Sequence, residues 1–232
     1  MLNHFDHTVL YFINGFAHRS ISMDRIVEVL SWNRLFKGGL IIAIYWYLWF
    51  SRKEAVNVTE RRKTLLASIA GTLAALVLAK VLAIALPFRS RPLHNPDLSL
   101  LLPYSIHNVM KDLSSFPSDT ATLVSGLAVG IWLISRRIGS ITVLYALIFV
   151  ILPRIYLGLH YPTDILGGVL IGTSAVMLAN VSSVKNGITD KLLEWSEKYP
   201  QAFYGFFFLL TFEMASLFNN LTDLLQVMVQ RR

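Results

Sequence analysis

Residues 138–182 read IGSITVLYALIFVILPRIYLGLHYPTDILGGVLIGTSAVMLANVS, and a short charged segment divides this stretch into two apolar runs. The runs cover residues 138–153 and 164–182. A transmembrane helix needs about 20 mostly apolar residues, and shorter runs are accommodated when flanking side chains reach the interface. The stretch therefore predicts two membrane-spanning helices that are joined by a short polar loop.

Apolar runs of this kind recur along the 232-residue chain, of which 54% is hydrophobic and only 15% is charged. A soluble domain normally carries about a quarter charged residues, so this composition indicates a membrane protein. The other expected spans are residues 38–50, 64–86, 118–135 and 201–218. Residues 5–18 form a shorter apolar stretch and predict an interfacial helix. The expected fold is an all-α polytopic membrane bundle of about six transmembrane helices, built as a single domain over residues 1–232.

The loops between the expected spans differ in their charge. The linker 51–63 holds five basic residues, and Arg136 and Arg137 lie together between two spans. Cytoplasmic loops of membrane proteins are enriched in Lys and Arg, so we expect these two loops inside. The loops 87–117 and 154–163 should then meet on the extracytoplasmic face.

The composition also excludes several classes of site and partner. The chain has no cysteine, which excludes disulfides and thiolate metal sites, and no acidic cluster indicates a divalent metal ion or other cofactor. The net charge of +7 on so apolar a chain favours membrane lipids, not nucleic acid, as partners. The first residues lack a basic region followed by a long apolar core, so no cleaved signal peptide is expected. The sequence leaves the oligomeric state open.

Two polar clusters flank the expected spans on the extracytoplasmic side. PFRSRP, residues 87–92, places Arg89 and Arg91 one residue apart, and a guanidinium fork suits phosphate oxygens. SSFPSDTAT, residues 114–122, puts Ser118 at the start of a helix, where free N–H groups attract anions. Each cluster also has a simpler interpretation, namely arginines at the lipid interface and an ordinary helix cap.

A third cluster, RIYLGLHYPTD at residues 154–164, supplies Arg154, His160 and Asp164 within one short turn. A carboxylate four residues from a histidine can fix its tautomer and leave the other ring nitrogen free as a nucleophile or base. Ionisable groups at a membrane edge are costly unless they are used, so we interpret His160 as a nucleophile. The arginines and the helix start would then cradle a phosphate for transfer through a phosphohistidine.

The order of these motifs resembles the type-2 phosphatidic-acid phosphatase superfamily, which includes undecaprenyl-diphosphate phosphatases and lipid phosphate phosphatases. The motif core runs from about residue 80 to 168, and Arg154, His160 and Asp164 match the third family motif at full spacing. The resemblance implies a helical bundle, metal-free dephosphorylation at the extracytoplasmic face, and His160 as the nucleophile that Asp164 orients. It also implies a bacterial inner, or plasma, membrane as the location.

The first family motif is not complete in this chain. It places a lysine six residues before Arg-Pro, and the corresponding position here, counted back from Arg91, is Ile84. Lys80 lies one helical turn earlier on roughly the same face. Either Lys80 reaches the site or Arg89 supplies the missing charge, and we favour Arg89 because it lies at the rim.

The middle motif differs more seriously, because Thr120 stands where the family has a histidine that protonates the leaving group. General acid catalysis is worth typically 100- to 10,000-fold, and a threonine hydroxyl does not supply it near neutral pH. Asp119, His94 or His107 are alternative acids. A diphosphate needs an acid less, because its leaving group is a stable phosphate anion, so we favour a polyprenyl diphosphate over an alkyl monoester.

These features predict a metal-independent lipid phosphatase or diphosphatase that acts on an undecaprenyl-type diphosphate or a related lipid phosphate. Two alternatives stay open. The chain could pass the phosphoryl group from His160 to another acceptor, or it could bind lipid phosphate without turnover, which Ile84 and Thr120 would explain. A small anion transporter is less favoured, because the sequence has no internal repeat.

Overall fold

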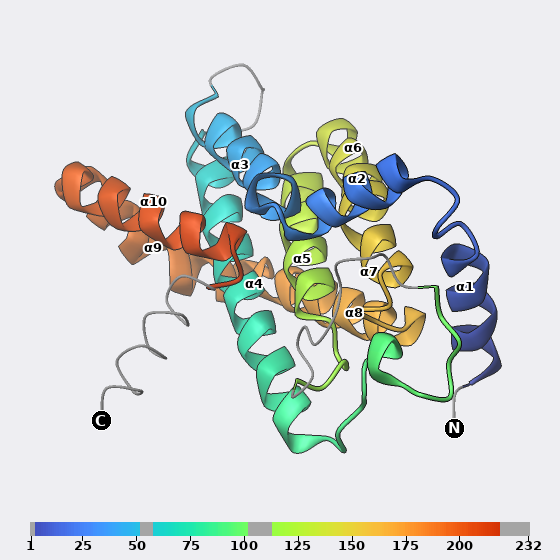
Figure 1. Cartoon of the computed structure of the whole chain (residues 1–232). Coiled ribbons are helices and arrows are strands. Elements are labelled where there is room, and N and C mark those ends of the chain that lie inside the picture. The colour runs from blue at the N-terminus through green and yellow to red at the C-terminus, as the bar shows by residue number, and fades with distance from the viewer. Residues whose placement is uncertain (1–2, 52–57, 102–112, 219–232) are drawn as a thin grey trace, which may run out of the picture.

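All regular elements are helical in residues 3–51, 58–101 and 113–218, which are the parts of the chain that the computed structural model describes (Figure 1). This confirms the all-helical fold. The α-helices are α1 (His4–Asn14), α2 (Ile21–Trp32), α3 (Leu40–Phe50), α4 (Val58–Ala85), α5 (Asp119–Ile134), α6 (Arg136–Tyr145), α7 (Leu152–Tyr156), α8 (Pro162–Ala179), α9 (Ser182–Lys198) and α10 (Pro200–Ala215). Short π-helical turns, η1 (Leu35–Gly39) and η3 (Ala146–Ile151), precede α3 and α7, and η2 (Pro92–His94) is a 3₁₀ turn.

Three of the described helical segments are long and apolar enough to cross a membrane, namely Val58–Ala85, Arg136–Tyr156 and Pro162–Ala179. They coincide with the spans expected at 64–86, 138–153 and 164–182. Two shorter apolar helices, Leu35–Phe50 and Asp119–Ile134, coincide with two further expected spans. The total of six spans, and the interfacial position of α1, stay predictions.

The centre of the bundle consists of α4, α5 and α8, which pack closely against one another (Figure 1). Small residues allow this approach: a Cβ atom added at Gly168 of α8 would lie only 2.4 Å from the carbonyl oxygen of Ser118. Helices in membranes pack by such close contacts, because lipid is as apolar as the side chains. The contact places the start of α8 directly beside the start of α5, where the second and third sequence clusters lie.

Two amphipathic helices, α2 and α9, are absent from the elements expected from the sequence. Helix α9 follows α8 and is held to the start of α4 by ion pairs, Lys63–Asp190 at 2.7 Å and Lys185–Glu60 at 2.9 Å. Helix α2 is held by Asp24, which accepts a hydrogen bond from the hydroxyl of Tyr156 in α7. Both helices are short and polar on one face, so hydropathy alone does not reveal them.

The last described helix, α10, packs its aromatic side chains against α3. Trp49 stacks on Phe203 with ring centroids 5.8 Å apart, and its indole N–H donates to the hydroxyl of Tyr204. Beyond α10, Ser216 and Leu217 lie beside the polar end of α5. The last part of the described chain therefore reaches the end of the bundle where the polar clusters of the sequence meet.

Candidate active site

The three polar clusters of the sequence meet at one end of α4, α5 and α8. Main-chain hydrogen bonds join them: Ser115 N donates to Arg89 O (2.9 Å), Leu93 N to Gly158 O (2.9 Å) and Ser118 N to Asp164 O (3.1 Å). Gly158 has a φ of +64°, a left-handed conformation that glycine adopts without strain. This turn reverses the chain after α7 and brings His160 toward α5.

His160 is held by its ring nitrogens and is almost completely buried. Its Nδ1 lies 2.9 Å from the carbonyl oxygen of Ser115, which can only accept, so we assign the proton to Nδ1. Nε2 then carries the lone pair and accepts a hydrogen bond from Arg91 Nη1 at 3.2 Å. Burial lowers the pKa of His160 below its usual value, although the neighbouring Asp164 opposes the shift. The ring is therefore neutral at neutral pH and has the tautomer that a nucleophile requires.

Asp164 contacts the surrounding loop more directly than it contacts His160. Its Oδ2 lies 3.8 Å from His160 Nδ1, beyond hydrogen-bond distance, and accepts from the main-chain N–H of Tyr161 at 2.8 Å. Its Oδ1 accepts from Arg89 at 2.5 Å. In this geometry the carboxylate caps α8 and acts on the histidine through its charge, while the Ser115 carbonyl makes the contact that orients the ring.

Arg89 lies between two buried carboxylates. Its Nη2 donates to Asp6 at 2.6 Å, its Nη1 donates to Asp164 at 2.5 Å, and its guanidinium lies 4.1 Å from the centre of the Tyr161 ring. Asp6 also accepts from the N–H and hydroxyl of Thr163, at 2.8 and 2.7 Å. Arg89 lines neither of the pockets described below. Its contacts favour a clamp between α1 and α8 over a phosphate ligand.

Arg91 and Arg154 are both buried, and each lines one of the two pockets, described below, that His160 also lines. Arg91 Nη1 also donates to the carbonyl of Leu159 at 2.8 Å, and Arg154 Nη2 donates to the Thr120 hydroxyl at 3.2 Å. The Nε atom of each guanidinium has no hydrogen-bond partner among the described residues. Buried donors normally find acceptors, so these arginines are suited to an anion.

The start of α5 carries the second cluster. Ser118 is the N-cap, and its side chain accepts from Ala121 N at 3.3 Å, so the ordinary capping interpretation applies to its hydroxyl. Asp119 accepts from Thr120 N at 2.7 Å and from Lys80 Nζ at 3.4 Å. Lys80 is mostly exposed and is paired with Asp119 at the edge of the site. Thr120 is buried and contacts Asp119 and Arg154.

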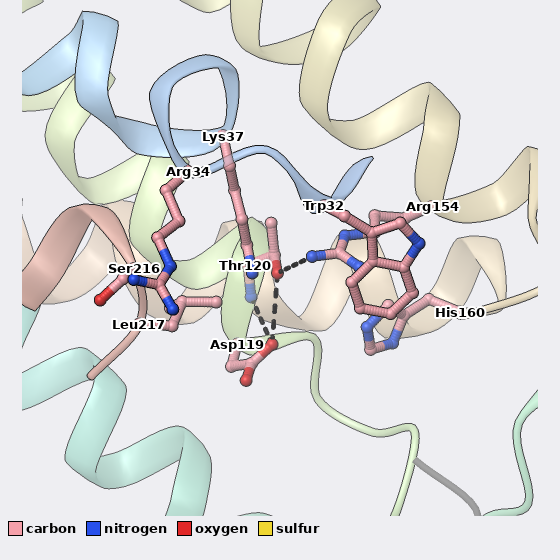
Figure 2. Close-up of a pocket in the computed structure, with 9 residues that line it drawn as sticks. All are labelled: Trp32, Arg34, Lys37, Asp119, Thr120, Arg154, His160, Ser216 and Leu217. Carbon is pink, nitrogen blue, oxygen red and sulfur yellow. Dashed lines mark hydrogen bonds between the residues drawn. The ribbon is translucent and has the colours of Figure 1, made fainter. Parts of the chain in front are cut away.

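Two pockets meet at Asp119 and His160. The first, which we call the cationic pocket, has a volume of about 50 Å³ (Figure 2). It is lined by Trp32, Arg34, Lys37, Asp119, Thr120, Arg154, His160, Ser216 and Leu217. The second, the apolar groove, measures about 370 Å³ and is lined mainly by Ala79, Ala83, Ile84, Phe88 and Leu113, with Lys80 and Arg91. His160 therefore lies between a space for a charged group and a space for an apolar chain.

No cluster of three or more His, Asp or Glu side chains that could hold a metal ion occurs in the described parts of the chain. His94 lies in η2 and lines neither pocket. His107, the other alternative acid, lies outside the described residues. Among the described residues that were considered as a general acid in place of the missing histidine, only Asp119 lines the pockets.

A family model described as the PAP2 superfamily matches residues 64–188, which is more than half of the chain. The chain belongs to the PAP2 superfamily. The matched residues include the whole motif core, so the resemblance inferred from the motifs is confirmed. With its long apolar helices, this PAP2 chain is a membrane protein.

Relatives of this PAP2 protein include two Bacillus proteins. Undecaprenyl-diphosphatase BcrC of Bacillus subtilis (strain 168) is 26% identical over 159 residues, which are 68% of this chain and 74% of the relative. Bacitracin transport permease protein BcrC of Bacillus licheniformis is 24% identical over 191 residues, 82% of this chain and 86% of the relative. No solved structure matches the chain.

Asp6 and Lys37 both precede the PAP2 match, and the sequence interpretation singled out neither of them. Asp6 lies in the expected interfacial helix 5–18, where a charge near the helix start has an ordinary explanation. Lys37 directly precedes the expected span 38–50, where interfacial lysines are common. Neither signal separates a site residue from a surface one.

Proposed function

We propose that this PAP2 protein is a metal-independent lipid diphosphatase, which removes the terminal phosphate of an undecaprenyl-type polyprenyl diphosphate through a phosphohistidine. The observation that carries the proposal is His160, which lines both pockets and has the unprotonated nitrogen Nε2 beside Arg91. Family membership and the similarity to undecaprenyl-diphosphatase BcrC support the class of substrate.

In the first step, His160 Nε2 attacks the terminal phosphorus, and the bond between this phosphorus and the bridging oxygen breaks. The lipid monophosphate leaves as an anion. Arg91 donates to a phosphoryl oxygen in place of His160 Nε2, which frees the lone pair for the attack. Arg91 and Arg154 together offset the charge on the phosphoryl oxygens, so side chains supply the positive charge that a metal ion supplies in other phosphoryl transfers. Positioning and charge stabilisation provide most of the catalysis in such reactions.

In the second step, water attacks phosphorus, and the N–P bond breaks. Inorganic phosphate leaves, and His160 recovers its neutral form. Thr120 takes no proton-transfer role, which is tolerable because a lipid monophosphate is a good leaving group without protonation. An alkyl monoester would have to release an alkoxide, so we expect the monophosphate to be a much poorer substrate.

The direct test is phosphate release by the purified protein in detergent, comparing a polyprenyl diphosphate with its monophosphate, with and without EDTA. We expect release from the diphosphate that EDTA does not reduce and that the His160→Gln variant loses. A phosphoryl group from labelled diphosphate should appear on the protein as an acid-labile adduct. His94→Gln is the matched control, because His94 lines neither pocket.

Different results would point to the alternatives. Loss of lipid diphosphate without free phosphate would indicate transfer to another acceptor. Binding of the lipid with no turnover, unchanged in His160→Gln, would indicate a binding protein and contradict the proposed diphosphatase. EDTA inhibition that added metal reverses would contradict metal independence.

A further inference from the structure

Lys37 is a buried lysine, and its side chain lines the cationic pocket. Its relative exposure is 5%, and its ammonium group has no side-chain hydrogen bond or ion pair within the described residues, where Asp119 is the carboxylate that shares the pocket with it. Other lysines of the described chain are paired, for example Lys63 with Asp190 at 2.7 Å and Lys185 with Glu60 at 2.9 Å. A buried ammonium group is unfavourable unless an anion accompanies it, so the position of Lys37 is suited to an anionic ligand.

The backbone around Lys37 is fixed from two sides. The Tyr145 hydroxyl donates to the carbonyl of Phe36, and a Cβ atom added at Gly38 would lie 2.9 Å from Cα of Ala215 in α10. Lys37 itself lies in the π-helical turn η1, and such turns often occur at functional sites. The packing of α10 and of the α6–η3 segment thus fixes the main chain on both sides of Lys37, and this orients its side chain.

The side chain points from η1 toward Thr120 and Asp119 at the start of α5 (Figure 2). Lys37 and Arg154 bring two positive charges to the pocket, while Asp119 is the one carboxylate among the described residues that line it. Asp119 is already 3.4 Å from Lys80 on the side of the apolar groove. The pocket therefore has an excess of positive charge, and its volume of about 50 Å³ suits a single phosphoryl group and excludes a lipid chain.

We propose that Lys37 is a phosphate-binding residue, which donates from its ammonium group to oxygens of the phosphoryl group that His160 attacks. It brings a second buried cation beside Arg154 at the position where Thr120 replaces a histidine, and it comes from a segment before the PAP2 match. The ammonium group also offsets the charge on the oxygens when the bond to the leaving group breaks. The inference rests on the proposed function for the identity of the phosphoryl group.

The test measures binding of inorganic phosphate to the full-length protein in detergent, by isothermal titration calorimetry. A hydrogen bond to a charged group contributes about 1.5–3 kcal/mol, so Lys37→Met should weaken binding by at least about tenfold. Lys37→Arg should retain affinity within a few fold. Lys191→Met removes an exposed lysine of α9 and is the control. Lys37→Gln gives a polar second variant, and thermal unfolding checks that each variant is folded.

Three outcomes are distinguishable. Weaker phosphate binding in Lys37→Met and Lys37→Gln, with rescue by Lys37→Arg, would establish the role even if polyprenyl diphosphate were not hydrolysed. Binding equal to that of the unmodified protein in both neutral variants would overturn it, even if hydrolysis required His160. The absence of phosphate binding by the unmodified protein would overturn it too, whereas the hydrolysis assay would still decide the proposed function.

Discussion

The ring of His160 is oriented by the carbonyl oxygen of Ser115, a residue 45 positions earlier in the chain. Asp164, four residues later, lies too far for a hydrogen bond and is bonded to Arg89 and to the main chain of Tyr161. A main-chain acceptor cannot be protonated or removed by mutation, so it fixes the tautomer over the whole working range of pH. We infer that changes at Asp164 will act on the loop and on Arg89 as much as on the histidine.

The burial of His160 leads to a prediction about pH. Burial lowers its pKa from the usual 6.5, so the neutral, nucleophilic form persists below pH 6.5. Protonation removes the lone pair, so kcat/KM for the diphosphate should fall only as the pH drops below a midpoint that lies under 6.5. Between the lowered pKa of folded His160 and pH 6.5, the histidine of the unfolded chain binds more protons than that of the folded chain. The free energy of unfolding should therefore also decrease as the pH falls through this range.

The measurement is a profile of kcat/KM against pH, with the titration of the substrate followed separately by phosphorus NMR. An acid limb with its midpoint at or above pH 6.5 would contradict the burial of the histidine in the working enzyme.

At the level of the helices, the site depends on the approach of α8 to α5. Gly168 lies against the carbonyl of Ser118, and the N–H of Ser118 donates to the carbonyl of Asp164. The two helix starts therefore form one unit, in which His160, Asp164 and Asp119 share a rigid support. The clamp of Asp6 on Arg89 attaches α1 to the same unit.

Gly168→Ala tests this contact. The new Cβ atom would lie 2.4 Å from a main-chain oxygen, which cannot turn aside as a side chain can, so α8 must move away from α5. Overpacking of this kind costs typically about 1–3 kcal/mol, and the displacement should also reduce phosphate release. Unfolding in denaturant and the activity assay are the measurements.

Gly205→Ala is the matched control for this change. Gly205 lies in α10, and a Cβ atom there would meet no heavy atom within 4 Å. Because alanine has the higher helix propensity, the control should keep or slightly raise stability. Equal behaviour of the two variants would contradict the tight contact between α5 and α8.

For the molecule as a whole, the candidate site extends beyond the PAP2 match. Residues 64–188 supply Arg91, Asp119, Arg154 and His160, whereas η1 supplies Lys37 and the end of α10 supplies Ser216 and Leu217. The apolar groove lies beside α4, so a lipid could enter from the membrane while its phosphates reach the polar end of the bundle. This arrangement requires the polar end to face one side of the membrane.

The chain has no cysteine, which allows that side to be determined with single cysteines. Ser99→Cys places an exposed thiol at the end that holds the site, and Arg137→Cys places one in the first turn of α6, at the other end. Because of the positive-inside bias, a membrane-impermeant maleimide should label Ser99→Cys in intact bacterial cells and Arg137→Cys only after permeabilisation. The reverse pattern would put the site in the cytoplasm, and the unmodified chain gives the background.

The sequence by itself determined the helical fold, the membrane class and the family, and it singled out Arg91, Arg154 and His160. Hydropathy and motif spacing are local properties, so they can be read from a single sequence before the packing of its helices is known. The amphipathic helices α2 and α9 were not visible in it, because one face of each helix is polar. Only the tertiary structure decided which charges meet: Arg89 is bonded to Asp6, 83 residues away, and Lys37 shares a pocket with Asp119 and Arg154. The partner of a buried charge depends on how distant helices pack, and no local pattern in the sequence encodes it.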